Sequence, residues 1–312
     1  MNLFDLHCDT LYKSVTQNLP LDDTSMQVSQ TLNKDDKRIQ CYAIWIPDDY
    51  SPGKAEQIFY SAHKKFTSEC KRLGIKFIEQ GESVYNCFKN NVNSALFTIE
   101  NSSALNGKIK NIERFSKLGV RIITLTWNDS NIVGDGAGVL HPQGITEFGQ
   151  KVISEMENNN IVVDVSHASE MLFYDVAKIA TRPFIATHSN SRSVTNHRRN
   201  LTDEQFNIIK NNKGIVGVTF HRDFLNNFSD TANKYDLIKH IDKFLSLGGE
   251  NTVCIGTDFD GCNLPVDITG SESLTEIYEM LLKDNYKESV IRKIFYENAL
   301  NFFENFDNKR IM

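Results

Sequence analysis

The sequence predicts a single (β/α)8 TIM barrel, with residues 1–312 forming one domain that ends in C-terminal helices. Three observations support this prediction. Eight short apolar runs rich in β-branched residues recur along the chain, and segments with the apolar spacing of helices separate many of them. The length of 312 residues accommodates such a barrel, which commonly takes about 250 residues.

The eight apolar runs are expected to be strands buried on both faces. A parallel sheet covered by helices contains nearly continuous hydrophobic runs, and these runs have that character. The expected strands are Leu3–His7, Ile39–Ile46, Ser94–Glu100, Val120–Trp127, Ile161–His167, Pro183–Ser189, Gly214–Phe220 and Thr252–Phe259.

Apolar residues at helical spacing predict helices between and after these strands. The stretch Thr202–Gln205 has the pattern of a capping box and indicates a further helix start, and Ser169 is a suitable N-cap. The expected helices are Ala55–Leu73, Ile145–Asn160, Ser169–Ala180, Tyr235–Gly249, Ser273–Lys283 and Lys287–Phe303.

The alternative architecture is an open, doubly wound sheet. Such sheets usually bind nucleotides through a glycine-rich turn after the first strand, and no such turn follows Leu3–His7. The glycine-rich stretch Gly134–Gly138 follows the fourth strand and lacks the fingerprint spacing, so we interpret it as a flexible loop. The barrel is therefore the preferred prediction, with long loops after strands two and four.

Composition excludes several classes of protein. The formal net charge is -6, and the most basic stretch, His197–Asn200, is too short for a nucleic-acid-binding patch. No segment approaches the roughly 20 apolar residues of a membrane span, and no signal peptide or lipid anchor is expected. The six cysteines are scattered without a C-x-x-C motif, so buried reduced thiols in a cytoplasmic protein are expected. The sequence is compatible with a homodimer.

Polar residues gather at the expected carboxyl ends of the strands, where barrel enzymes carry their chemistry. His7 and Asp9, two residues apart, should project to the same side of the first strand. The remaining members of this set each follow or end another strand: they are Glu100, His167, His188 and Asp258.

Taken singly, each of these residues is more often structural, because short motifs give many false matches. Together they would form a ring of three histidines, two aspartates and one glutamate at one barrel mouth. Such a ring can hold two divalent ions, with Glu100 bridging them and Asp258 left to handle a proton. The alternative is a barrel with coincidental polar residues at its rim.

Six stretches, in order along nearly the whole chain, carry a family resemblance: DLHCDT, TIEN, RIITLTWND, DVSHAS, ATHSNSRSVTNHRRNLTDEQ and IGTDFDG. Through them the chain resembles the membrane (renal) dipeptidase family of zinc peptidases, in its soluble bacterial form. The resemblance implies a TIM barrel of the metallo-dependent hydrolase type with two zinc ions, although other divalent metals are compatible with these ligands. It assigns His7 and Asp9 to one ion, His167 and His188 to the other, and Glu100 as the bridge.

The same resemblance implies that Asp258 carries the proton and that Arg199 binds the terminal carboxylate of the substrate. Two departures from the family pattern stand out. Trp127 occupies the place of a histidine that steadies the oxygen of the tetrahedral intermediate in many relatives, and Asn128 or His221 could substitute for it. Asn101 replaces the glycine that commonly follows the bridging glutamate, so we expect it to narrow the mouth.

The expected function is hydrolysis of free dipeptides, L,L and also L,D, by a water activated at a binuclear zinc site. Neither nucleic acid nor a membrane is an expected partner. Two alternatives stay open at this point. One is a metallohydrolase acting on a phosphoester, lactone or cyclic amide, since Arg199 would also suit a phosphate. The other is a metal-binding relative without turnover, because of the change at Trp127.

Overall fold

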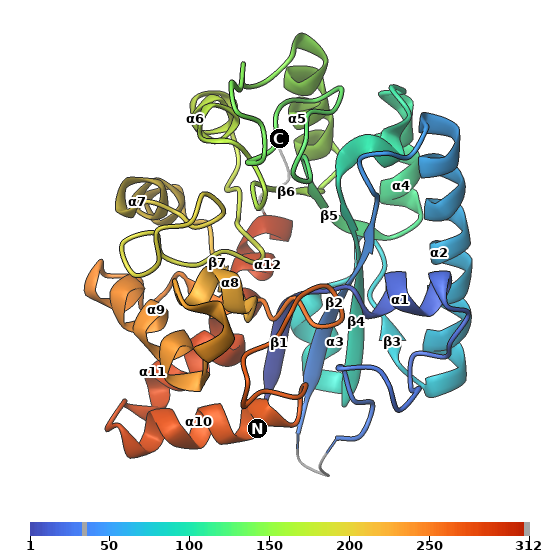
Figure 1. Cartoon of the computed structure of the whole chain (residues 1–312). Helices are drawn as coiled ribbons and strands as arrows, with labels where there is room; N and C mark the ends of the chain where they lie inside the picture. Colours follow the sequence, from blue (N-terminus) through green and yellow to red (C-terminus); the bar gives the residue numbers. More distant parts are fainter. Residues whose placement is uncertain (33–35, 309–312) are drawn as a thin grey trace.

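The computed structural model of the chain describes residues 1–32 and 36–308. Its parallel strands form one curved sheet in the order β6-β5-β4-β2-β1-β8-β7 (Figure 1). The short strand β3 (Lys76–Phe77) pairs with the beginning of β4. The strands of the main order are β1 (Leu3–Cys8), β2 (Arg38–Trp45), β4 (Asn93–Glu100), β5 (Val120–Thr124), β6 (Val162–Asp164), β7 (Val216–Val218) and β8 (Val253–Ile255).

The predicted sixth strand is reduced to two bridges, which nevertheless close the sheet. Ile185 bridges Asp164 at the end of β6, and Ala186 bridges Val216 at the start of β7, both in parallel. The expected strands therefore neighbour one another in sequence order around a closed ring. This arrangement confirms the TIM-barrel prediction, although several observed strands end earlier than the sequence suggested.

Helices cover the outside of the sheet, with α2 and α4 on one side and α6, α7 and α9 on the opposite side (Figure 1). The helices are α1 (Thr10–Thr16), α2 (Pro52–Leu73), α3 (Val84–Asn90), α4 (Lys110–Lys117), α5 (Glu147–Asn158), α6 (Glu170–Ile179), α7 (Asp203–Asn211), α8 (Arg222–Leu225), α9 (Lys234–Ser246), α10 (Ser273–Lys283), α11 (Glu288–Arg292) and α12 (Asn298–Asn308). Short 3-10 turns lie at Ser102–Leu105 and Ser229–Thr231.

Local sequence signals explain several helix boundaries. The predicted capping box is present at the start of α7. The Thr202 side chain accepts a hydrogen bond from the backbone N–H of Gln205, and the Gln205 side chain accepts one from the backbone N–H of Thr202. Ser169 accepts a hydrogen bond from the backbone N–H of Leu172 and so caps α6. Helix α2 ends at Gly74, whose φ of 66° is the left-handed conformation that glycine adopts without steric cost.

The amino-terminal end of the barrel is closed by the C-terminal helix. Residues from all eight strand positions form one apolar cluster with α3 and α12, and Phe4 of β1 stacks on Phe303 of α12 at 5.5 Å. The predicted helix over Lys287–Phe303 is interrupted by a π-helical turn at Lys293–Glu297, which joins α11 to α12. Because α12 and this apolar cluster fill the amino-terminal end of the barrel, a pocket can open only at the carboxyl-terminal end.

The glycine-rich stretch Gly134–Gly138 is held by defined contacts, so its interpretation as a flexible loop is wrong. Gly134 bridges Ile145 and Gly136 bridges Ala168. A Cβ atom at Gly136 would lie 2.1 Å from the carbonyl oxygen of Trp127, so only glycine permits this approach. The stretch packs against the chain that carries Trp127 and Asn128, and it thereby supports the wall of the site.

All six cysteines are unpaired, and all but the partly exposed Cys262 are buried, as predicted for reduced thiols. Among the described residues, none of the helices combines the length and the apolar character needed to cross a bilayer.

Candidate metal centre

The six polar residues predicted at the strand ends meet at the carboxyl-terminal end of the barrel. The ring centroids of His7 and His188 are 4.0 Å apart, and those of His167 and His188 are 5.0 Å apart. Each of the six is less than 9% exposed. Residues that end or follow β1, β4, β6, β8 and the bridging segment therefore form one buried cluster.

Glu100, the last residue of β4, lies in the middle of this cluster. Its Oε1 atom is 2.8 Å from His167 Nε2 and 3.7 Å from His188 Nε2. Its Oε2 atom is 3.6 Å from His7 Nε2. The two carboxylate oxygens thus face two separate groups of ligands.

His7 faces two further carboxylates on the other side of the cluster. Its Nε2 atom is 3.4 Å from Asp9 Oδ2 and 3.7 Å from Asp258 Oδ1. Potential metal-ligating atoms lie within 4.8 Å of one another in two groups, one of His7, Glu100 and His188 and one of His7, Asp9 and Asp258. The predicted proximity of His7 and Asp9 is therefore correct.

Irregular backbone aims several of these side chains. The pairing of β1 with β2 shifts register between Asp5 and Cys8, where His7 enters the site. His167 and Asp258 both have positive φ, 70° and 65°. Positive φ is uncommon outside glycine, and such strain concentrates at functional sites.

Burial and mutual charge shift the pKa values of the cluster strongly. Burial and the charge of Glu100 raise the pKa of Asp9 to about 6. Burial, with a contribution from Asp9, also raises the pKa of Asp258 well above its usual range. Burial would lower the pKa of His7, but Glu100 and Asp9 together outweigh burial through their charges and hydrogen bonds and raise that pKa well above normal.

The other two imidazoles are held in the neutral form. Burial lowers the pKa of His188 well below its usual value, and burial together with the charge of Arg199 lowers the pKa of His167 to about 3. Their Nδ1 atoms have partners: His167 Nδ1 lies 3.0 Å from Asn128 Oδ1, and His188 Nδ1 lies 2.9 Å from Thr187 Oγ1. Both rings therefore direct Nε2 toward Glu100.

The donor set fits divalent metal ions. His7 Nε2, His188 Nε2 and Asp9 Oδ1 are buried without a hydrogen-bond partner among the described residues. Neutral imidazoles and ionised carboxylates are the usual ligands of zinc. The positive charge of a bound cation would keep the crowded carboxylates ionised and the imidazoles neutral. The cluster accordingly satisfies its polar atoms best with cations bound.

A pocket of about 200 Å³ opens onto this cluster. One of its walls is aromatic: the Trp45 ring contacts Tyr12 and Trp127, each with centroids 4.9 Å apart. Trp127 is thus part of the pocket lining. Asn128 also lines it, but its side-chain oxygen is engaged by His167, so it serves at least partly to orient that ring.

Arg199 lines the same pocket and is buried. Its side chain is 7% exposed, and its Nε and Nη2 atoms have no partner among the described residues. The guanidinium carbon is 5.4 Å from the centroid of the Phe224 ring. Burial lowers the pKa of Arg199 to about 10 against the opposing charges of Glu100, Asp258 and Asp164, so the side chain is cationic at neutral pH.

His221 also lines the pocket and stacks on Phe224 with ring centroids 4.1 Å apart.

The expected narrowing of the mouth by Asn101 is not what the structure shows. Asn101 is fully buried outside the pocket lining, and its amide nitrogen donates to Ile46 O and Asp48 Oδ1. Its φ of 77° explains why a residue tolerant of left-handed backbone stands there.

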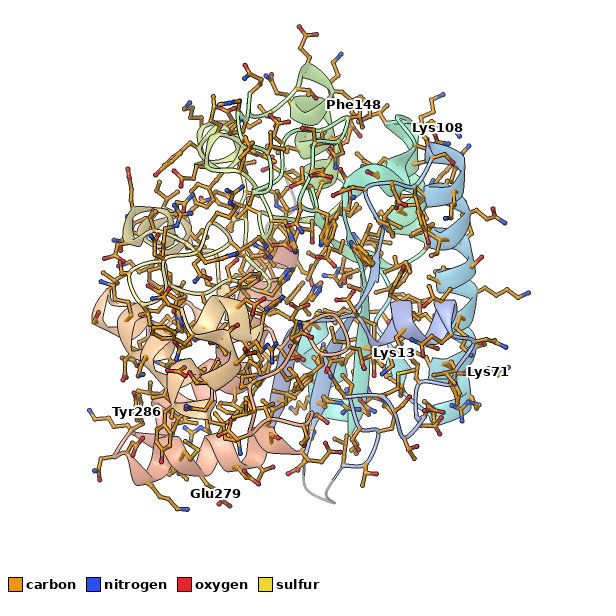
Figure 2. The ribbon with its side chains drawn as sticks, viewed as in Figure 1. Lys13, Lys71, Lys108, Phe148, Glu279 and Tyr286 are labelled. Atoms are coloured by element: carbon orange, nitrogen blue, oxygen red, sulfur yellow. The ribbon has the colours of Figure 1, made fainter. Side chains whose placement is uncertain are left out.

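Sequence reasoning missed several lining residues: Tyr12, Trp45, Phe224, Asp260 and Gly261. Gly261 is required sterically, because a Cβ atom there would lie 2.0 Å from Asp9 Oδ2. Asp260 accepts from Lys13 Nζ at 2.9 Å and from Thr10, which fastens α1 to the loop after β8. Lys13 lies within the outline of the molecule, whereas Lys71 and Lys108 lie at its edge (Figure 2). In the sequence, the DFDG motif at Asp258–Gly261 was the signal available for Asp260 and Gly261.

Comparison with known proteins matches residues 1–310 to the family described as membrane dipeptidase, peptidase family M19. An uncharacterised protein encoded in the pqqA 5′ region of Klebsiella pneumoniae is 32% identical over 230 residues, which are 70% of this chain and 84% of that protein. An uncharacterised dipeptidase of Schizosaccharomyces pombe is 30% identical over 215 residues, 67% of this chain and 51% of the other.

Two solved structures share the fold over almost the full length. A dipeptidase of family M19 superimposes with a TM-score of 0.85 at 26% identity, covering 97% of this chain and 98% of its own. A metallo peptidase from Rhodobacter sphaeroides, liganded with a phosphinate mimic of L-Ala-D-Ala, superimposes with a TM-score of 0.88 at 23% identity, covering 97% and 99%.

Proposed function

The chain belongs to the membrane dipeptidase family, peptidase family M19, and from this premise we propose that it hydrolyses free dipeptides at a binuclear zinc site. A metal-dependent dipeptidase activity follows from the family itself. The proposal adds the number and identity of the ions, the ligands and the roles of the pocket residues.

One observation carries the choice of substrate. The buried guanidinium of Arg199, whose Nε and Nη2 atoms have no hydrogen-bond partner among the described residues, lines the same small pocket as the cluster of candidate metal-ligating side chains. An unpaired buried cation is unfavourable unless a ligand supplies the anion. The free carboxylate of a dipeptide fits this need, since it lies a short distance from the scissile bond.

We assign His7 and Asp9 to one ion and His167 and His188 to the other, with Glu100 bridging. The separate orientation of the two Glu100 oxygens supports this division. Two bound zinc ions would supply an acidic water and a polarised carbonyl group.

The remaining steps belong to side chains of the protein. Asp258 lines the pocket beside His7, and we assign to it the transfer of the proton from the attacking water to the leaving amine. Arg199 binds the terminal carboxylate and orients the peptide bond against the cluster. Trp45 and Trp127 limit the access of bulk water along one wall, and His221 and Asn128 complete the polar lining.

The proposal extends to both L,L and L,D dipeptides. Contacts to the scissile carbonyl and the terminal carboxylate do not involve the substituent at the second Cα atom. A cytoplasmic location is also proposed, and the six unpaired thiols support it, since disulfides persist mainly in oxidising compartments.

The test is a hydrolysis screen with zinc-loaded and chelator-treated protein. Its arms are L,L dipeptides, L,D dipeptides, tripeptides and a phosphodiester. Zinc-dependent cleavage of dipeptides far above tripeptides supports the proposal. Preferred cleavage of the phosphodiester would replace it with the other metallohydrolase function that Arg199 could serve. Metal analysis giving a single ion at saturation would contradict the binuclear assignment.

A further inference from the structure

Asp164, the last residue of β6, is a fully buried carboxylate outside the proposed ligand set. It accepts four hydrogen bonds. Its Oδ2 atom accepts from the hydroxyl groups of Thr124 and Thr187, both at 2.6 Å. Its Oδ1 atom accepts from the backbone N–H groups of Ser166 and Thr187, both at 2.9 Å. These bonds fasten β5, β6 and the bridging segment together below the metal centre.

The hydroxyl group of Thr187 links this carboxylate to an imidazole. A threonine hydroxyl has one hydrogen to donate, and Thr187 donates it to Asp164 Oδ2 at 2.6 Å. The hydrogen of Thr187 is therefore directed to Asp164, and its oxygen must accept from His188 Nδ1, 2.9 Å away. This direction requires a proton on Nδ1 of His188, which leaves the lone pair on Nε2.

His188 Nε2 is the atom that faces the cluster, 3.7 Å from Glu100 Oε1, and it is buried without a hydrogen-bond partner. A metal-ligating imidazole must present a lone pair, and the partner of its other nitrogen fixes the tautomer and the ring orientation. Without such a partner, the ring would also populate the tautomer with the hydrogen on Nε2, and in that tautomer Nε2 cannot bind metal.

We infer that Thr187, held by Asp164, is a positioning residue that selects the metal-binding tautomer of His188. This inference rests on the proposed assignment of His188 as a ligand. It predicts that the single hydroxyl of Thr187 sets the affinity of one metal ion without contacting it.

A second buried aspartate–threonine pair in the barrel, Asp5 and Thr257, provides a matched control. Thr257 donates its hydroxyl hydrogen to Asp5 Oδ2 at 2.7 Å and its backbone N–H to Asp5 Oδ1 at 2.9 Å. The backbone N–H of His7 also donates to Asp5, as that of Ser166 does to Asp164. Both threonines are fully or almost fully buried and directly precede a residue of the cluster. Only Thr187 lies within hydrogen-bond distance of an imidazole nitrogen.

The experiment compares Thr187→Val, Thr187→Ser and Thr257→Val in the full-length protein. The readout is zinc affinity for each ion, measured by competition with a chromophoric chelator. Loss of a partner of a metal-ligating histidine typically costs 10–100-fold in affinity. We expect Thr187→Val to weaken one ion by about that factor, Thr187→Ser to restore it, and Thr257→Val to leave both affinities unchanged.

A second readout is independent of metal. In metal-free protein labelled with 15N-histidine, NMR correlations should show the His188 proton on Nδ1 in the parent and in Thr187→Ser. Thr187→Val should show a shift toward the Nε2-protonated form. An unchanged tautomer in folded Thr187→Val would overturn the inference, as would equal losses of zinc affinity in Thr187→Val and Thr257→Val.

His188→Ala separates this inference from the proposed function. If His188→Ala keeps both ions at parental affinity, the ligand assignment is wrong, and the inference fails with it. If His188→Ala loses an ion while Thr187→Val binds like the parent, the metal site stands and only the role of Thr187 is refuted.

Discussion

Replacement of Arg199 by alanine should reduce kcat/KM for free dipeptides far more than it changes the metal centre. The guanidinium is buried, lines the pocket beside the proposed ligands and has two nitrogens without a partner in the described part of the chain. A hydrogen bond to a charged group contributes about 1.5–3 kcal/mol. Since about 1.4 kcal/mol corresponds to a factor of ten, losing a carboxylate contact of about 2–3 kcal/mol lowers kcat/KM by about 10²-fold.

The neighbouring Arg198 is the matched control. It is exposed, and its Nη1 atom donates to the backbone carbonyls of Ala137 and Gly138 on the adjoining loop. Arg198→Ala removes an equal charge one residue away without touching the carboxylate site. We expect its kcat/KM for dipeptides to stay close to that of the parent protein.

The assay compares each free dipeptide with its C-terminal amide and with the corresponding tripeptide, at saturating zinc and with metal content measured. The parent should cleave the free dipeptide far better than the other two. Arg199→Ala should lose activity mainly on the free dipeptide, because the amide never used the charge. Equal losses on the free and amidated substrates would refute the reasoning and show that Arg199 only supports the fold.

Four further outcomes are expected. Glu100→Ala should lose both ions on metal analysis, and two fully occupied sites would disprove the bridge. Asp258→Asn should keep metal but lose about 10²–10⁴-fold in kcat, as for general acid–base groups, and a near-normal kcat would require another proton carrier. Trp127→Phe should keep fold, metal and most of the turnover, since the ring forms a wall; abolished turnover would instead assign chemistry to the indole N–H. Burial lowers the pKa of His240 from 6.5 to about 4, so the unfolded chain binds a proton first as the pH falls. Urea unfolding should therefore show stability decreasing between pH 6.5 and about 4, by up to about 3 kcal/mol, with a smaller decrease in His240→Gln.

The cluster at the barrel mouth was predictable because parallel strands bring their carboxyl ends together. Each of His7, Glu100, His188 and Asp258 follows a hydrophobic run, and the closure of the ring turns positions far apart in sequence into neighbours. The sequence carried no comparable signal for Tyr12 and Trp45. Their place in the pocket depends on how α1 and β2 pack, and an aromatic residue in a helix or strand is more often part of the core.

The supporting contacts were unpredictable for a different reason. Hydrogen bonds such as those of Asp164 depend on backbone geometry that periodicity does not encode, because a strand pattern shows only which face a residue occupies. His240 illustrates the same limit. Its apolar helical surroundings in the sequence indicate only a place on a helix, whereas the structure shows that it is fully buried, accepts from the Ser191 backbone N–H through Nδ1 and donates toward Leu225 O through Nε2.

The position of His240 connects the fold to the choice of substrate. It lies beneath the loop that runs from His188 to Arg199 and joins this loop to the end of α8. Asn200 adds a second link, because its side-chain amide donates to the Phe224 carbonyl. A long polar loop with so few apolar residues would otherwise be mobile, and a mobile cation could accept carboxylates at many distances. Because the loop is tied at both ends to buried groups, the separation between the guanidinium and the ligand cluster is fixed by the barrel. In the proposed mechanism, a fixed separation lets the single charge of Arg199 discriminate a dipeptide from a longer chain.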